Sequence, residues 1–236
     1  MRITILTLLF LSSFYKSIAQ DSNKYNKAIH NVVDSLYRED QFYIGLTFNL
    51  ITNQPESYSQ NGFSGGLHFG FIRDMPFNKR RNLAIGVGLG HSLNTYNSNL
   101  FIGEEPSGET IFRTLGSSDN ADRNRFNTNL IEMPIQFRWR TSSPMNYSFW
   151  RIYGGVKLSY IYYYRAVFEN KDISITQTEI PELNRMRYAA ILTLGNGSFN
   201  AFFQYDLNTL FDKNAMINLD RINLQTLKFG IEFYIL

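Results

Sequence analysis

Apolar residues recur at every second position along most of this chain after residue 40, and this alternation limits the possible folds more than any other feature. In the first such segment, residues 42–50, Phe, Ile and Leu alternate with Tyr, Gly, Thr and Asn. Successive side chains of a β-strand point to opposite faces, so the pattern predicts a strand with one apolar face. The eight alternating segments are residues 42–50, 64–73, 83–90, 129–140, 150–165, 185–194, 199–211 and 227–236.

The connections between these segments are alternately long and short. The long ones cover residues 52–63, 96–128, 166–184 and 212–226, and the shorter ones cover 74–82, 141–149 and 195–198. An even number of antiparallel strands, with short turns at one rim and long loops at the other, is typical of outer-membrane barrels. The sequence therefore predicts an all-β fold: an eight-stranded antiparallel up-and-down transmembrane β-barrel over residues 41–236, in the cell outer membrane, with both termini in the periplasm.

A soluble barrel or sandwich is the alternative, because it is also built from alternating strands. Its apolar face would point inward and its outer face would carry many charges. In this chain only 18% of the residues are charged while 16% are aromatic, and the charges share a face with the glycines. A wide apolar face with Tyr and Trp near its ends favours contact with lipid.

The first twenty residues predict a signal peptide. They carry Arg2, an apolar run over residues 3–11 and the small-x-small sequence Ser17-Ile18-Ala19, so we expect cleavage near Ala19/Gln20. Cleavage removes two of the 23 basic residues and none of the 20 acidic ones, which lowers the formal net charge from +3 to +1. The basicity of the sequence therefore gives no reason to expect nucleic acid as a partner.

Residues 21–40 are the one stretch with helical spacing, and they predict a periplasmic amphipathic helix. Its apolar stripe consists of Tyr25, Ile29, Val32, Val33 and Leu36. This stripe could dock on a partner protein, or it could cover the periplasmic mouth of the barrel. The spacing does not decide between these two roles.

Eight strands enclose a lumen that side chains can fill, with no room for an open channel. Charges of both signs fall on the inward face, and buried charges are tolerated only when they are paired and hydrogen-bonded. We expect a salt-bridge network across the lumen, either as a rigid plug, which we favour, or as the lining of a narrow ion path. Its members are Glu132, Arg138, Arg151, Lys157, Arg187, Asp206, Lys228 and Glu232. Glycines on the same face should make room for the long side chains; they are Gly66, Gly70, Gly86, Gly88 and Gly90.

The motifs of the chain do not favour catalysis, a cofactor or a metal. The glycine run over residues 86–90 lacks both the third glycine and the helix of a dinucleotide-binding loop. His30, His68 and His91 are scattered, and residues 117–124 depart from the spacing of a calcium loop. His91 and Ser92 are neighbours on a strand, so they point to opposite faces and cannot form a base–nucleophile pair. We expect a non-enzymatic protein without cofactors.

Two further features concern single strands. Residues 229–236 alternate aromatic and other residues up to an apolar last residue, which is similar to the terminal-strand signal read by the outer-membrane insertion machinery. We therefore expect that machinery and outer-membrane lipid as partners. Pro134 falls on the lumen face, and because proline lacks an N–H, it predicts a β-bulge or a bent strand at residues 132–136.

The fourth segment also carries a family resemblance. Residues 129–138 read Asn-Leu-Ile-Glu-Met-Pro-Ile-Gln-Phe-Arg, and they resemble the L-E-[IM]-P-(L/I)-x-x-(K/R) strand of PorT-family outer-membrane β-barrels. The glycine-rich third segment and Tyr153-Gly154-Gly155-Val156 are similar too, whereas the Leu-Ile pair before Glu132 departs from the usual pattern. The resemblance covers residues 42–236. It implies a barrel, a role in the type IX secretion system and secretion-system proteins as partners, and it carries over no catalytic residue.

Three functions stay open at this point. The leading hypothesis is an accessory component of protein export across the outer membrane, in type IX secretion and gliding. The second is a surface-binding or adhesive, OmpX-like barrel that uses the long loop at residues 96–128. The third is a narrow porin.

Overall fold

The computed structural model describes residues 40–141, 149–217 and 220–235. The expected signal peptide over residues 1–20 and the stripe of the expected helix therefore lie outside the described residues. In the described part of the chain, no helix is long and apolar enough to cross a membrane.

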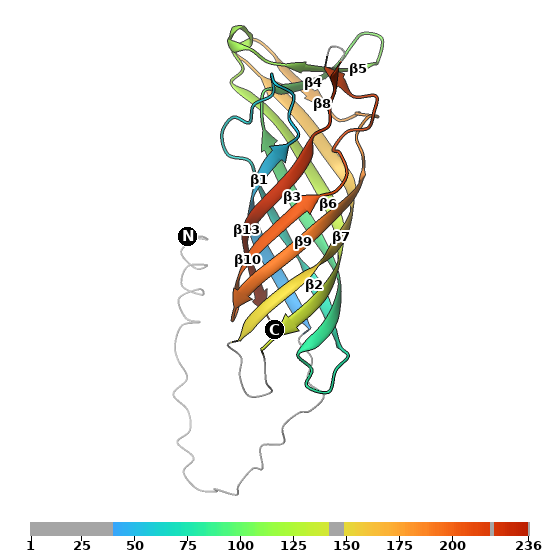
Figure 1. Cartoon of the computed structure of the whole chain (residues 1–236). Coiled ribbons are helices and arrows are strands. Elements are labelled where there is room, and N and C mark those ends of the chain that lie inside the picture. The colour runs from blue at the N-terminus through green and yellow to red at the C-terminus, as the bar shows by residue number, and fades with distance from the viewer. Residues whose placement is uncertain (1–39, 142–148, 218–219, 236) are drawn as a thin grey trace, which may run out of the picture. The chain divides into compact units, whose positions relative to one another are not determined.

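Eight tilted strands form the wall of a closed barrel (Figure 1). They are β1 (Gln41–Thr52), β2 (Gly65–Pro76), β3 (Leu83–Asn97), β6 (Arg123–Arg140), β7 (Trp150–Glu169), β9 (Met186–Asn196), β10 (Phe199–Asp206) and β13 (Gln225–Ile235). The antiparallel order is β6-β3-β2-β1-β13-β10-β9-β7, and pairing of β6 with β7 closes the ring. The predicted eight-stranded up-and-down barrel is confirmed.

The first and last strands of the barrel are hydrogen-bonded neighbours. Their register runs from Phe42 opposite Ile235 to Thr52 opposite Gln225. The ring therefore joins strands from opposite ends of the barrel sequence, while the remaining neighbours follow one another along the chain.

The apolar side chains lie outside and the polar side chains lie inside, as the alternation predicts. On β1, Phe42 is 61% exposed, whereas Asn49 on the other face is fully buried. Trp139 and Trp150 flank the short β6–β7 connection, and outward tyrosines occupy the opposite half of the wall. These tyrosines are Tyr160, Tyr162, Tyr163, Tyr188 and Tyr205. An apolar outer face with aromatic residues towards both ends is the surface that a barrel presents to lipid.

The long connections all lie at the end of the barrel opposite the C-terminal end of β13 (Figure 1). They carry short elements: β4 (Leu100–Glu104), β5 (Thr110–Thr114), a 3-10 turn at Ser117–Asp119, β8 (Ser174–Gln177), β11 (Met216–Ile217) and β12 (Asp220–Arg221). The loop expected over residues 96–128 is shorter than predicted, because β3 continues to Asn97 and β6 already begins at Arg123. Short turns face the periplasm in such barrels, so the long connections form the extracellular end.

The prediction of a β-bulge at Pro134 is wrong. The ladder between β6 and β7 is regular from Glu132 to Gln136, and the register between β6 and β3 is the same on both sides of the proline. Only the pairs opposite Gly88 and Leu89 are missing on the β3 side. A Cβ atom on Gly88 would lie 3.0 Å from the Pro134 ring. The absence of that side chain therefore leaves room for a proline in a strand without a bulge.

A register shift occurs elsewhere, where β7 holds one extra residue between the partners of Asn129 and Leu130. Tyr162 and Tyr163 consequently both point outward, and the alternation beyond them is reversed. Strict alternation over residues 150–165 would place Tyr164 on the lipid face and Arg165 in the lumen, but Tyr164 is buried and Arg165 is exposed. A single extra residue in a strand of period two moves every following side chain to the other face.

Candidate functional site

The barrel interior contains all eight charged residues that the sequence placed there. None of the eight exposes more than 5% of its surface. They come from the inward faces of β6, β7, β9, β10 and β13. The following contacts show which of them are paired.

The first group of contacts joins β2, β6, β7, β9, β10 and β13. The Lys157 ammonium donates to Glu132 at 2.9 Å, and the imidazole of His68 lies 3.0 Å from the carboxylate of Glu232. Thr193 donates to the other oxygen of Glu232 at 3.3 Å. The Phe202 ring lies between the two pairs, with the Lys157 nitrogen 5.0 Å and the His68 ring 4.6 Å from its centroid.

A second group surrounds Asp206 of β10. Arg187 donates to its carboxylate at 2.8 Å, Gln204 donates at 2.8 Å and the Thr226 hydroxyl also donates to it. Lys228 donates to the side-chain oxygen of Asn94 at 2.9 Å. In the part of the chain that the structure describes, no carboxylate lies within 4.0 Å of the Lys228 ammonium.

A third group lies at the periplasmic end and includes two residues that the sequence analysis did not select. Arg138 and Arg140 both donate to Asp74, at 2.7 and 2.9 Å, and all three side chains are fully buried. Arg138 also donates to Gln41 and stacks over the Tyr153 ring at 4.1 Å. Two guanidinium groups therefore share one carboxylate beside the short turns.

Arg151 differs from the other predicted residues in its surroundings. It is buried against aromatic rings, with its guanidinium carbon 4.4 Å from the Phe149 ring centroid and 5.6 Å from that of Tyr234. Among residues 40–141, 149–217 and 220–235, no carboxylate lies within 4.0 Å of Arg151. Cation–π contact is the interaction that a buried guanidinium makes with such rings.

The inward glycines make room for large side chains, as the sequence suggested. A Cβ atom on Gly70 would lie 2.6 Å from the Tyr43 hydroxyl, and one on Gly90 would overlap that hydroxyl. A Cβ atom on Gly86 would lie 2.7 Å from Cδ of Arg138. The neighbouring strands β2 and β3 therefore lack the side chains that would collide with the lumen residues.

The extracellular end is covered by an apolar cluster that the sequence analysis did not foresee, and we call it the cap core. All four long connections contribute to it, and its member Phe211 is fully buried. The Phe211 ring packs 5.1 Å from Phe112 and 6.1 Å from Phe126. Its further members from the connections are Tyr58, Leu100, Ile102, Ile180, Leu183, Leu210, Ala215, Ile217, Ile222 and Leu224.

The remaining candidates from the sequence are the His91–Ser92 pair and the loop over residues 117–124. His91 points outward and its Nε2 lies 2.6 Å from the hydroxyl of Tyr162, while Ser92 is buried on the inward face. In the loop over residues 117–124, Asp119 accepts hydrogen bonds from Gly116 and Arg113, both at 2.8 Å. Among the described residues, no group of three or more His, Asp or Glu side chains could hold a metal ion.

Comparison with known proteins gives one family match. A model described as outer membrane protein beta-barrel domain matches residues 18–212, and no curated protein matches the chain. Among solved structures, that of Ail, the attachment invasion locus protein of Yersinia pestis, is 14% identical with a TM-score of 0.39, and the match covers 85% of this chain and 100% of that one. A second Ail structure, in complex with the heparin analogue sucrose octasulfate, has a TM-score of 0.36 at the same identity and coverage.

Proposed function

We propose that this chain, which belongs to the outer membrane protein beta-barrel domain family, is a non-enzymatic and non-conducting barrel that binds a protein partner through its extracellular cap. The cap core carries the proposal. Ordering the backbone of a loop costs about 1–2 kcal/mol per residue, and the four long connections meet that cost by sharing one apolar core. A surface that is already ordered binds a partner at a smaller entropic cost than free loops would.

The interior supports a barrel that does not conduct. Ion pairs fill the lumen from Asp74 at the periplasmic end to Asp206, and the cap core covers the other end. An eight-stranded barrel leaves space only for side chains. The purified protein should therefore give no current steps in planar bilayers, and reproducible steps would refute this part of the proposal.

An accessory role in protein export is the second candidate. It is supported by the resemblance of residues 129–138 to the PorT-family strand. In this case the partner is a component of the cell's own secretion system, whereas an adhesive barrel has its partner outside the cell. The stripe at Ile29 and Val33 is a further docking candidate for the export role only.

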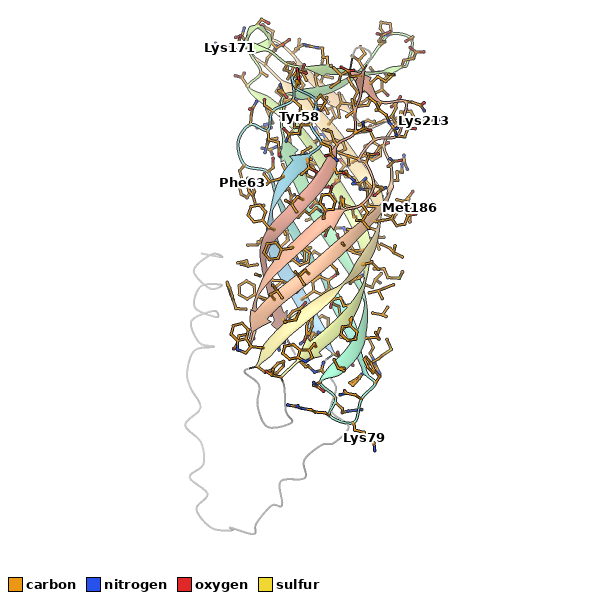
Figure 2. All side chains as sticks on the ribbon, in the orientation of Figure 1. Tyr58, Phe63, Lys79, Lys171, Met186 and Lys213 are labelled. Carbon is orange, nitrogen blue, oxygen red and sulfur yellow. The ribbon has the colours of Figure 1, made fainter. Side chains whose placement is uncertain are left out.

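Site-specific photocrosslinking in living cells tests the proposal and separates the two partners. Ser107 lies at the exposed tip of the β4–β5 hairpin, so a photoreactive residue there samples the cap without disturbing its core. Lys79, in the short β2–β3 turn at the opposite end (Figure 2), is the matched control. An adduct from position 107 and none from position 79 is expected.

The identity of the adduct decides between the candidates. A secretion-system protein, together with secretion lost on Ile29→Asp and Val33→Asp, supports the export role. An extracellular protein, with secretion intact, supports adhesion. If position 107 gives no protein adduct while the barrel is folded and inserted, the cap is not the binding surface and the proposal fails.

A further inference from the structure

A hollow of about 850 Å³ lies on the outer wall of the barrel, below the cap. It is bordered by β1, β2, β3 and β6 and by the β1–β2 connection, from which Phe63 projects with 71% exposure (Figure 2). This hollow is on the lipid-facing side, so it is distinct from the charged lumen and from the exposed top of the cap.

The hollow changes from apolar to polar along the barrel axis. In one row of the ladder, Leu46, Leu67, Leu93 and Asn129 lie side by side. In the row above, Gly65, Thr95 and Asn127 are neighbours, and Asn97 lies opposite Arg125 in the next outward row. Successive outward rows are about 6–7 Å apart along a strand. The wall therefore passes from leucine to amide and guanidinium groups within about two rows.

Among the described residues, Arg125 is the only charged one that borders this hollow. Its Nε donates to the side-chain oxygen of Asn97 at 3.0 Å, and no carboxylate lies within 4.0 Å of it in the described part of the chain. Asn97 is itself fixed, because its amide donates to the Phe63 carbonyl and its backbone N–H donates to Ser64 at 2.9 Å. A cation is thus held in place on the outer wall, two outward rows above the leucines.

A second hollow, of about 1000 Å³, continues upward from the first and shares Asn61, Asn97 and Arg125 with it. Its lining is mostly Asn, Ser and Asp, from the β1–β2, β5–β6 and β7–β8 connections and from the ends of β3 and β6 with the residues that follow β3. Amide and hydroxyl groups are the donors and acceptors that bind sugar hydroxyls. The two hollows together offer leucines for acyl chains, a guanidinium for an anionic group and a polar space for sugars.

We propose that the two hollows together form one groove on the outer wall, and that this groove binds a phosphorylated glycolipid of the outer leaflet. The acyl chains lie against Leu46, Leu67 and Leu93, a phosphate binds Arg125, and the sugars lie against Asn97, Asn127 and the polar hollow above. A guanidinium presents paired donors that match a phosphate and forms charge-assisted hydrogen bonds with it. The leucines and the guanidinium lie within about two rows of each other on one wall, so a ligand with both acyl chains and an anionic group can contact both.

Native mass spectrometry of the full mature protein in non-ionic micelles tests this proposal. The probes are a bisphosphorylated, acylated glucosamine disaccharide, its dephosphorylated form, its deacylated form, and phosphatidylglycerol. We expect retention of the intact glycolipid and a drop of about tenfold or more in apparent affinity on Arg125→Gln, as expected when one charge-assisted hydrogen bond is lost. Arg73→Gln is the matched control, because Arg73 is an exposed arginine near the other end of β2.

Each comparison between the probes tests a different contact. Equal binding of the dephosphorylated form refutes the phosphate site, and equal binding of the deacylated form refutes the acyl-chain contact. Equal binding of phosphatidylglycerol shows a general anion effect and refutes recognition of the sugar. Heat-dependent gel mobility shows whether the Arg125→Gln and Arg73→Gln proteins are folded. If both are folded and bind the intact glycolipid with equal affinity, the proposed site is wrong. None of these results depends on whether the cap binds a protein.

Discussion

Removal of one partner of the Glu132–Lys157 pair should destabilise the barrel strongly, while removal of both should not. The two charged atoms are 2.9 Å apart and both side chains are nearly fully buried. At an effective dielectric constant of about 20, unit charges at this distance attract each other by about 6 kcal/mol. Loss of one partner from a buried pair costs about 3–5 kcal/mol, because the remaining charge stays buried with neither water nor a counter-ion around it.

A double-mutant cycle measures this effect. Lys157→Met and Glu132→Leu should each lower the free energy of unfolding by about 3–5 kcal/mol, and the double variant should lose less than either single variant, since an apolar pair needs no counter-ion. Denaturant unfolding in lipid vesicles gives these free energies. Trp139 and Trp150 lie on the outer wall and report insertion by fluorescence.

Met133→Leu is the control for this cycle. Met133 is adjacent to Glu132 but faces lipid with 39% exposure, so the change should cost well under about 1 kcal/mol. If Glu132→Leu costs no more than this control, or if the two single costs simply add in the double variant, the buried pair does not contribute as the geometry implies.

Three further predictions concern the cap and the glycine strands. Phe211→Ala should leave the barrel inserted but open the cap, at a cost of about 3–5 kcal/mol, and increased cleavage of the long connections by an external protease is the measurement. Gly90→Ala should cost about 1–3 kcal/mol through overlap with the Tyr43 hydroxyl, and Tyr43→Phe should recover part of it; no recovery would locate the strain elsewhere. Hydrogen bonds from the Gly116 N–H and Arg113 lower the pKa of Asp119. The turn at Ser117–Asp119 should therefore be fully stable above the ordinary carboxyl pKa of about 3.9, and it should lose this stabilisation as the pH falls through the lowered pKa of Asp119. Amide exchange at Gly116 measures this, and Asp119→Asn should abolish the pH dependence.

The period-two pattern is sufficient to predict the fold and the side of the wall on which most residues lie. It fails beyond Tyr162, because nothing in the Tyr-rich run of β7 marks the position of an extra residue. Each of three successive tyrosines suits either the lipid face or the lumen. The reversal of Tyr164 and Arg165 depends on the pairing with β6, which is a tertiary property.

The charged interior is predictable in part, and the omissions have an identifiable cause. Asp74 falls in a predicted turn, because the run from Arg73 to Pro76 has the composition of one, although β2 continues through it. The structure adds one acidic and one basic residue to the predicted inward set, Asp74 and Arg140. Asp74 is the next inward position after Ile72, so it would have been selected if β2 had been predicted to continue to Pro76.

The cap core could not be predicted from the spacing of apolar residues along the sequence. Its residues come from connections in which apolar side chains follow no regular spacing, such as Leu210 and Phe211. They become a cluster only because the barrel brings the four long connections to the same end. The groove beside Arg125 could not be predicted either, because its leucines and amides belong to four different strands that become neighbours only in the folded barrel.

The register between β1 and β13 has a consequence for the way in which the protein is made. Since Phe42 lies opposite Ile235, the last contacts of the ring join residues separated by almost the whole barrel sequence. Such contacts give the fold a high contact order, and folding that depends on them is slow. Until β13 is synthesised, β1 exposes an unpaired edge that lipid cannot satisfy. Insertion and closure should therefore occur as one late cooperative event, during which a chaperone or the insertion machinery must shield that edge.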